Sequence, residues 1–148
     1  MKKLIISGLF ALALVTSAFA APTSMNAKAN AHFLASFAKA KNVSWTSFDL
    51  YEKVSFMQDN EKVEAFYGTD GEMIGVSKTI ALDKLPKDAL KTITTTYTFP
   101  EYQLKDCLVF TDSDNEKTYY VSFDKANENI VMKVTPGGFL RLMSKSKK

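Results

Sequence analysis

Residues 65–74 read AFYGTDGEMI, and this strand–turn–strand stretch decides the fold. The Asp-Gly pair in its middle readily adopts the positive φ angles that a tight β-hairpin requires. A second stretch of the same kind reads VMKVTPGGFL, occupies residues 131–140 and turns at Pro-Gly-Gly. Each stretch closes a segment that begins with a helix-like pattern. The sequence therefore predicts a helix-plus-hairpins module that occurs twice.

Two segments upstream of these hairpins have apolar residues at helical spacing. Residues 27–41 are rich in alanine and place their phenylalanines on one face. Asn26 or Ser24 could cap the start of this helix, because a short polar side chain can accept a free backbone N–H there. Residues 82–97 form the second helical segment, in which Pro86 suits the first turn.

Elsewhere the apolar residues recur with a period of two, which is typical of strands. In antiparallel sheets of this kind one face packs on the core and the other stays open. The predicted fold class is therefore α+β, an antiparallel sheet with helices packed on one face, made of two helix-plus-hairpins repeats at residues 27–80 and 82–144. The predicted strands lie at residues 43–48, 53–58, 62–68, 72–80, 102–111, 117–124, 130–135 and 139–143.

The N-terminus has the pattern of a secretory signal peptide. Lys2 and Lys3 precede an apolar run at residues 4–15, and Ala18-Phe19-Ala20 then forms a small-x-small cleavage site. The apolar run is too short to cross a bilayer comfortably. We therefore predict a signal peptide at residues 1–20, cleavage after Ala20, and a periplasmic or secreted protein without a membrane span.

Cleavage changes both the length and the charge of the working protein. Removing 20 of the 148 residues leaves 128, which suits one ordinary domain. We expect a flexible lead at residues 21–26, a domain at 27–144 and a basic tail at 145–148. The signal contains two of the 19 basic residues and none of the 16 acidic ones, so the net charge falls from +3 to +1. This balance gives no reason to expect a nucleic-acid partner.

The sequence offers few residues for catalysis or metal binding. His32 is the single histidine and Cys107 the single cysteine, so neither the usual zinc ligand sets nor an intramolecular disulfide can form within one chain. Cys107 lies in a predicted strand and is expected to be buried. Residues 112–116 carry alternating carboxylates but lack the EF-hand pattern, so we interpret them as a hairpin turn. We expect no catalytic residue, metal site or cofactor.

Alternation along the last strands separates candidate core residues from candidate contact residues. Tyr119, Val121 and Phe123 share one face, which we assign to the core together with Leu140 and Leu142. The opposite face would be open and carries residue types that are enriched at protein interfaces. The predicted partner-binding residues are Tyr120, Phe139, Arg141 and Met143, with Met73 as a counterpart in the first repeat.

Short motifs spread over the mature chain occur in a characteristic order: VSW at residues 43–45, FYGTDG at 66–71, LP at 85–86, PEY at 100–102, YYV at 119–121 and GG at 137–138. In their order and spacing the chain resembles the PepSY-like family, which is described as similar to the β-lactamase inhibitor protein. The family is found in secreted bacterial proteins, especially of Bacteroidetes-type bacteria. The resemblance implies helices on one side of an antiparallel sheet, no established enzymatic activity and no catalytic motif.

These observations predict an exported, non-enzymatic binding or inhibitor-like module. It would dock a protein partner, an envelope or secreted protein, through the open face of its sheet. Two alternatives stay open. A small-ligand-binding periplasmic protein would need an apolar cavity between helices and sheet, and an exported hydrolase using scattered carboxylates would need a cleft with two close carboxyl groups. The oligomeric state is not predicted.

Overall fold

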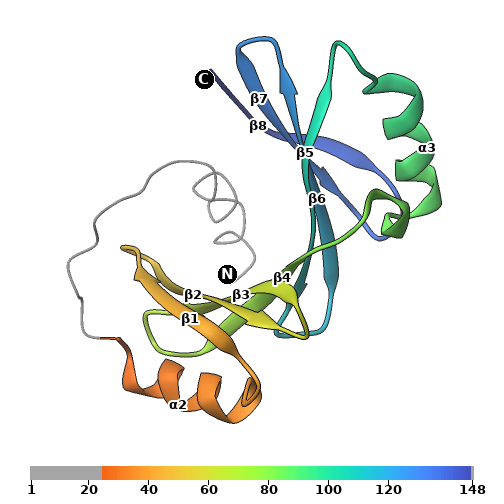
Figure 1. The fold of residues 1–148 in the computed structure, drawn as a ribbon. Coiled ribbons are helices and arrows are strands. Elements are labelled where there is room, and N and C mark those ends of the chain that lie inside the picture. Colours follow the sequence, from red (N-terminus) through yellow and green to blue (C-terminus); the bar gives the residue numbers. More distant parts are fainter. Residues whose placement is uncertain (1–24, 148) are drawn as a thin grey trace. The chain divides into compact units, whose positions relative to one another are not determined.

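The structure is a computed structural model that describes residues 25–147. The predicted signal peptide, residues 21–24 of the predicted lead and Lys148 lie outside the described residues. Within the described range, eight strands are hydrogen-bonded in chain order (Figure 1). The elements are α2 (Ala27–Ser36), β1 (Lys41–Ser47), β2 (Tyr51–Gln58), β3 (Glu61–Gly68), β4 (Met73–Thr79), the 3₁₀ helix η2 (Leu82–Lys84), α3 (Lys87–Thr96), β5 (Gln103–Asp112), β6 (Lys117–Lys125), β7 (Glu128–Val134) and β8 (Leu140–Lys147).

The predicted fold class, with helices packed on one face of the sheet in two helix-plus-hairpins repeats, is wrong. The fold is dominated by one antiparallel sheet, because strands hold 52% of the described residues and helices 19%. Local sequence shortens both helical segments. The first ends at Ser36, five residues before the predicted end, and β1 begins at Lys41. The second segment begins with the 3₁₀ helix η2, and α3 starts only after its N-cap residue Pro86. The α-helix is therefore ten residues long.

The contacts divide the chain into two compact units. The α2 unit comprises residues 25–80 and 108–117, and the α3 unit comprises residues 81–107 and 118–147. Strands β5 and β6 each contribute residues to both units, because the boundaries fall after Cys107 and after Lys117.

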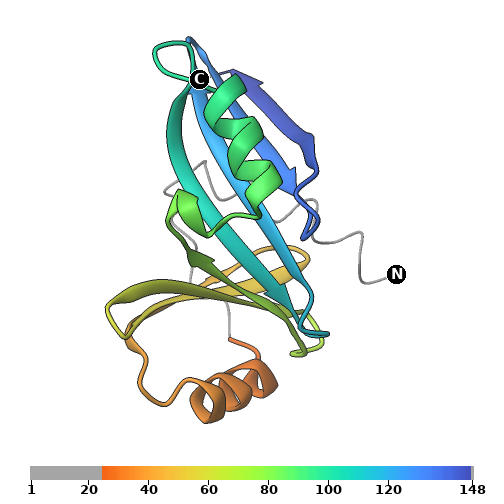
Figure 2. The same ribbon diagram turned by 90° about the vertical axis from the view of Figure 1, so that its right-hand side faces the viewer.

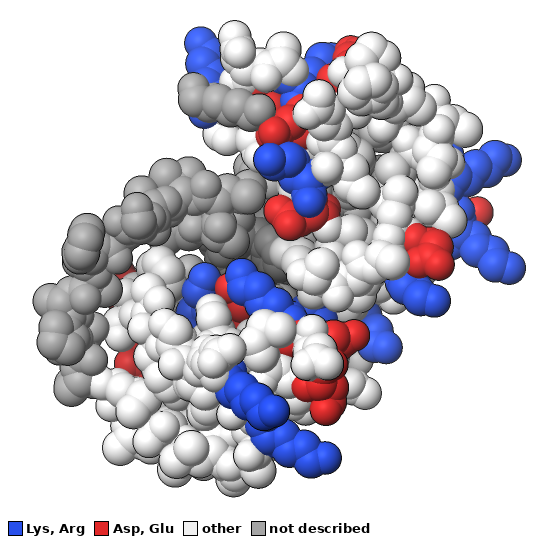
Figure 3. Space-filling model, in the orientation of Figure 1, with Lys and Arg blue, Asp and Glu red and all other residues white. Residues whose placement is uncertain are grey.

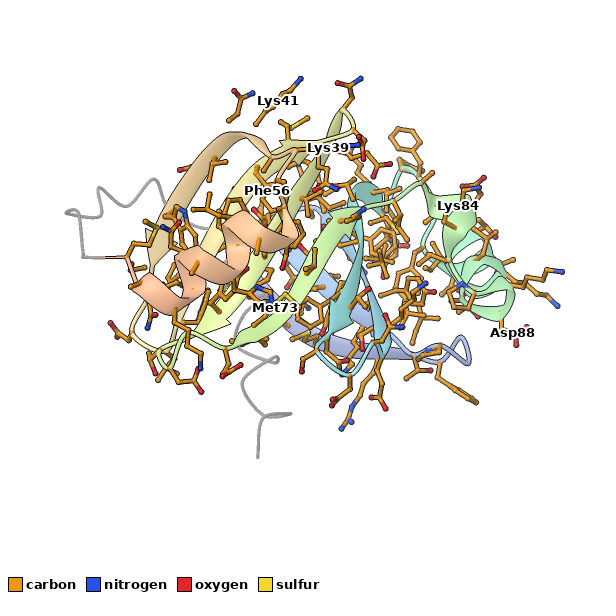
Figure 4. All side chains as sticks on the ribbon, turned by 90° about the horizontal axis from the view of Figure 1, so that it is seen from below. Lys39, Lys41, Phe56, Met73, Lys84 and Asp88 are labelled. Atoms are coloured by element: carbon orange, nitrogen blue, oxygen red, sulfur yellow. The ribbon has the colours of Figure 1, made fainter. Side chains whose placement is uncertain are left out.

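The core of the α2 unit lies between α2 and the strands beside it. Phe33 of α2 is buried, and its ring centroid lies 5.1 Å from that of Phe56 and 5.6 Å from that of Trp45. Figure 4 shows Phe56 and Met73 on the α2 side of the strands, where Met73 packs against this core. Aromatic pairs in such edge-to-face arrangements stabilise a core beyond the area that they bury.

Asn26 begins α2 and caps it. Its side-chain Oδ1 accepts hydrogen bonds from the backbone N–H groups of Lys28 at 2.9 Å and Ala29 at 3.3 Å. These groups have no partner within the helix, which is why a short polar residue is favoured at this position. Of the two caps considered from the sequence, the structure uses Asn26.

In the α3 unit, α3 lies along one face of the strands (Figure 2). Ile93 is buried, and the ring of Tyr97 stacks on that of Phe123 with centroids 5.2 Å apart. Gly138 has a φ of +86°, and a Cβ added there would lie 3.2 Å from the backbone nitrogen of Ala89. The last hairpin therefore approaches α3 so closely that glycine is needed at this turn.

Two predicted core assignments on the α3 side have different outcomes. Val121 and Phe123 are buried, as predicted, whereas Tyr119 and Leu140 are only half-buried. Leu142 pairs with Met132 across β7 and β8 but is 55% exposed. The physical reason is the position of β8, which is the last strand in the sheet order and has no strand beyond it.

Candidate partner-binding face

The strands β6, β7 and β8 have one face toward α3 and one face away from it. The stacking of Phe123 on Tyr97 identifies the α3-facing side. Because side chains alternate along a strand, Tyr120 and Ser122 belong to the other side. We call this side the α3-distal face. The strand register places on it two rows of directly paired residues: Tyr120, Lys133 and Arg141 in the first, and Ser122, Val131 and Ser144 in the second.

Phe139 and Arg141 provide the exposed part of this face. Phe139 is 77% exposed and Arg141 is also exposed. The turn before them is held by its own hydrogen bonds: Thr135 Oγ1 accepts from the N–H of Phe139 at 3.2 Å, and the carbonyl oxygen of Thr135 accepts from the N–H of Gly138 at 2.9 Å. An aromatic ring is thus displayed to solvent on a well-defined hairpin.

Tyr120 and Ser122, by contrast, are buried. Tyr120 is 2% exposed, and this burial raises the pKa of its hydroxyl to about 12. Ser122 is 6% exposed, and its hydroxyl makes no hydrogen bond within the described part of the chain. The sequence prediction placed Tyr120 among the open contact residues, and its part in partner binding stays a prediction.

The remaining predicted contact residues lie elsewhere. A register shift between Val131 and Met132 leaves Met143 as the extra residue of a β-bulge, so simple alternation does not set its direction. Met73 belongs to the α2 unit and packs on the α2 side of its strands. Lys133, which the sequence prediction omitted, joins Tyr120 and Arg141 in one row. Its position between the apolar Met132 and Val134 was the signal that could have identified it.

A half-open groove of about 380 Å³ lies on the α2 side of β4 and β5 in the α2 unit. It is lined by Met73, Val76, Lys78, Val109, Thr111, Asp112, Ser113 and Asn115. Asp112 is its single carboxylate, and the Oδ1 of Asp112 already accepts from the backbone N–H groups of Asp114 at 3.0 Å and Glu116 at 2.8 Å. This confirms the predicted hairpin turn at residues 112–116, and it leaves the groove without a carboxylate pair.

The other titratable candidates from the sequence have local partners or are buried. His32 lies on α2 with Nδ1 3.1 Å from the hydroxyl of Tyr67 and Nε2 3.4 Å from the hydroxyl of Ser36. Cys107 is buried as predicted, and burial raises the pKa of its thiol to about 11. Across residues 25–147, no three His, Cys, Asp or Glu side chains gather in a way that could hold a metal ion.

No family model and no curated protein matches the sequence. Solved structures do match. A DUF2874 family protein from Bacteroides uniformis aligns with a TM-score of 0.69 and 12% identity, over 83% of this chain and 89% of that one. A BLIP-like protein from Bacteroides fragilis aligns with a TM-score of 0.64 and 11% identity, over 88% and 89%.

A third solved structure is a protein from Bacteroides eggerthii whose description provisionally places it in the periplasm. It aligns with a TM-score of 0.71 and 11% identity, over 84% of this chain and 90% of that one. At these identities the likeness shows the fold alone, and that fold is the one shared by BLIP-like and DUF2874 proteins. The descriptions of the three structures name no enzymatic activity. No helix in residues 25–147 is long and apolar enough to span a membrane.

Proposed function

We propose that this chain is an exported, non-enzymatic binding module of the PepSY-like type that docks a protein partner through the α3-distal face. The observation that carries the proposal is the display of Phe139, which is 77% exposed and immediately precedes β8, two residues before the exposed Arg141 of that strand. Aromatic residues and arginine are enriched at protein interfaces, where a few anchor residues carry most of the binding energy. Phe139 and Arg141 are exposed close together on the α3-distal face, and we therefore propose them as the anchors of this interface.

Two further observations support the proposal. The chain has the fold of a BLIP-like protein, and one similar structure is described with a periplasmic location. The N-terminal sequence also fits a signal peptide cleaved after Ala20, which would place the protein in the periplasm or outside the cell. An envelope or secreted protein is therefore the expected partner.

The experiment compares the wild-type protein with the variants Phe139→Ala and Arg141→Ala in quantitative capture from envelope extract. Leu34→Ser is the matched control, because Leu34 is an exposed leucine of the α2 unit, 61% accessible. We expect the wild type and the control to capture one and the same protein. In titrations with that protein, the affinity of the purified Phe139→Ala and Arg141→Ala variants should be at least tenfold lower than that of the wild type. Equal affinity of the Phe139 variant, with an intact fold, would remove the proposal.

A second candidate function, small-ligand binding, is favoured by the groove beside β4 and β5. Its volume of about 380 Å³ falls within the range of ligand sites, and its floor is formed by apolar residues that include Val76 and Val109. Val76→Trp should fill the groove and abolish the co-purification of a small molecule detected by native mass spectrometry. If the same mass is retained by this variant, the groove is not the site.

A further inference from the structure

The α3-distal face carries two cations directly opposite each other. Lys133 of β7 pairs in register with Arg141 of β8. Like charges in this arrangement destabilise a sheet. Neither side chain forms a salt bridge within the described part of the chain, whereas nearby Lys125 and Lys145 have glutamate oxygens at 2.7 Å and 2.8 Å. The strand pair therefore holds an uncompensated positive charge on this face.

Among the described residues, no salt bridge to either cation compensates this charge. Asp124 lies on the same face, but its carboxylate is 3.4 Å from Lys105 Nζ and compensates that lysine. Figure 3 shows basic and acidic side chains interspersed on the visible side of the protein. The register, by contrast, places two cations, Lys133 and Arg141, directly opposite each other. A local excess of one sign attracts a group of the opposite sign.

A second, independent observation points to an acceptor at the same place. Ser122 follows Tyr120 by two residues on β6 and therefore lies on the same face. Its buried hydroxyl has no hydrogen-bond partner within residues 25–147. Buried polar groups are normally satisfied, so an unsatisfied hydroxyl indicates a missing partner. Ser122 stands in the row beside Tyr120, Lys133 and Arg141, so its buried hydroxyl marks the edge of the site, and an external carboxylate would pair there with the guanidinium and ammonium groups.

We propose that the α3-distal face binds an acidic segment of the protein partner, with Lys133 and Arg141 as the cation pair that receives its Asp or Glu side chains. The inference rests on the proposed function and names the chemistry of the partner. Phe139 immediately precedes β8 and lies two residues before Arg141 in the chain. The recognised segment therefore combines a carboxylate with an apolar residue that covers Phe139. A nucleic acid is disfavoured, because the mature chain has a net charge of about +1.

The test uses the purified exported protein and two capped peptides, Ac-DLDLDL-NH₂ and its uncharged isostere Ac-NLNLNL-NH₂. Binding is followed by NMR shifts of the backbone amides at residues 120–122, 131–133 and 139–144. We expect the acidic peptide to bind at least tenfold more tightly than the isostere and to shift the resonances of these amides. Its affinity should fall as the salt concentration is raised. The affinity for the acidic peptide should fall at least tenfold in the double variant Lys133→Glu/Arg141→Glu. It should be unchanged in Lys91→Glu, a control variant at an exposed position of α3.

Several results would overturn the inference: equal binding of the two peptides, shifts outside these residues, or unchanged binding by the double variant. Stronger binding of inorganic phosphate than of the acidic peptide would assign the cations to another anion and would also overturn it. Lys133→Gln/Arg141→Gln replaces the double variant if charge reversal impairs folding. If a captured partner depends on Phe139 but shows no acidic preference, this inference fails while the proposed function stands.

Discussion

Arg141→Glu should stabilise the α3 unit while weakening partner binding. The substitution places a carboxylate opposite Lys133 in the register of β7 and β8 and converts a repulsive pair into an attractive one. A residue retained for folding alone would not show these opposite effects. A gain in stability coupled to a loss of binding is the expected signature of charges that serve a partner.

The size of the gain follows from the geometry of the pair. Cross-strand charge pairs contribute roughly 0.2–1 kcal/mol, and the substitution removes one unfavourable contribution and adds one favourable contribution. Because Arg141 is exposed, solvent and salt screen the interaction. We expect the free energy of opening of β7 and β8 to rise by about 0.5–1.5 kcal/mol at low ionic strength.

The measurement is native-state hydrogen exchange at the β7 and β8 amides, at about 20 mM and about 500 mM salt. The high-salt Debye length of about 4 Å should remove most of the gain. Lys133→Glu should raise the free energy of opening by a similar amount. The double charge reversal should show no such gain, because two glutamates then face each other. This double-mutant cycle isolates the pair from other effects of each substitution.

An equal gain from Lys91→Glu would indicate a general charge effect and would refute the reasoning. A gain that is insensitive to salt, or a double variant that keeps the full gain, would refute it as well. In each of these cases the positions of Lys133 and Arg141 in the register would not produce the repulsion inferred from the structure.

Three further predictions concern stability. Gly75→Ala should cost about 1–3 kcal/mol in urea unfolding followed by fluorescence of Trp45, because its Cβ would lie 2.4 Å from the ring of Phe110; an unchanged midpoint would contradict this. Asn26→Ala should cost about 1 kcal/mol in urea unfolding through loss of the α2 cap, and Asn26→Asp should recover only part of it, because aspartate keeps the capping oxygen but cannot donate to the carbonyl of Thr69; an unchanged midpoint for Asn26→Ala would contradict this. Burial raises the pKa of Cys107 from 9.0 to about 11, so the folded state favours the neutral thiol. Its contribution to stability should be complete below pH 9 and decline toward pH 11, and a Cys107→Ala variant with the same alkaline decline would contradict this.

The sequence predicted features that depend on a few neighbouring residues. The Asp-Gly turn at residues 70–71 is present with Gly71 at a φ of +78°, Asn26 caps α2, and Val121 and Phe123 face the core. Each of these depends on local rules of turn geometry, capping or alternation. Such rules act within a few residues and do not depend on what the rest of the chain does.

Features that depend on distant pairing could not be predicted in this way. The periodicity of each strand does not specify that β4 pairs with β5, which lies beyond a whole helix in the chain. The bulge at Met143 depends on how β8 aligns with β7, and it changes which residues of β8 face the same way. Leu142 is exposed because its strand lies at the sheet edge, which its own sequence does not reveal. Lys133 became a candidate only when the register placed it beside Arg141.

The α3-distal face combines three features that each work against a stable, isolated fold. Phe139 leaves an aromatic ring in water, Lys133 and Arg141 repel each other, and the buried hydroxyl of Ser122 lacks a partner within the described residues. Any one of them could occur on an ordinary surface. Their occurrence on one face of the α3 unit is expected if an external segment covers that face, because local violations of folding rules concentrate at functional sites. An apolar and acidic partner segment has the chemistry to cover the ring and neutralise the cations.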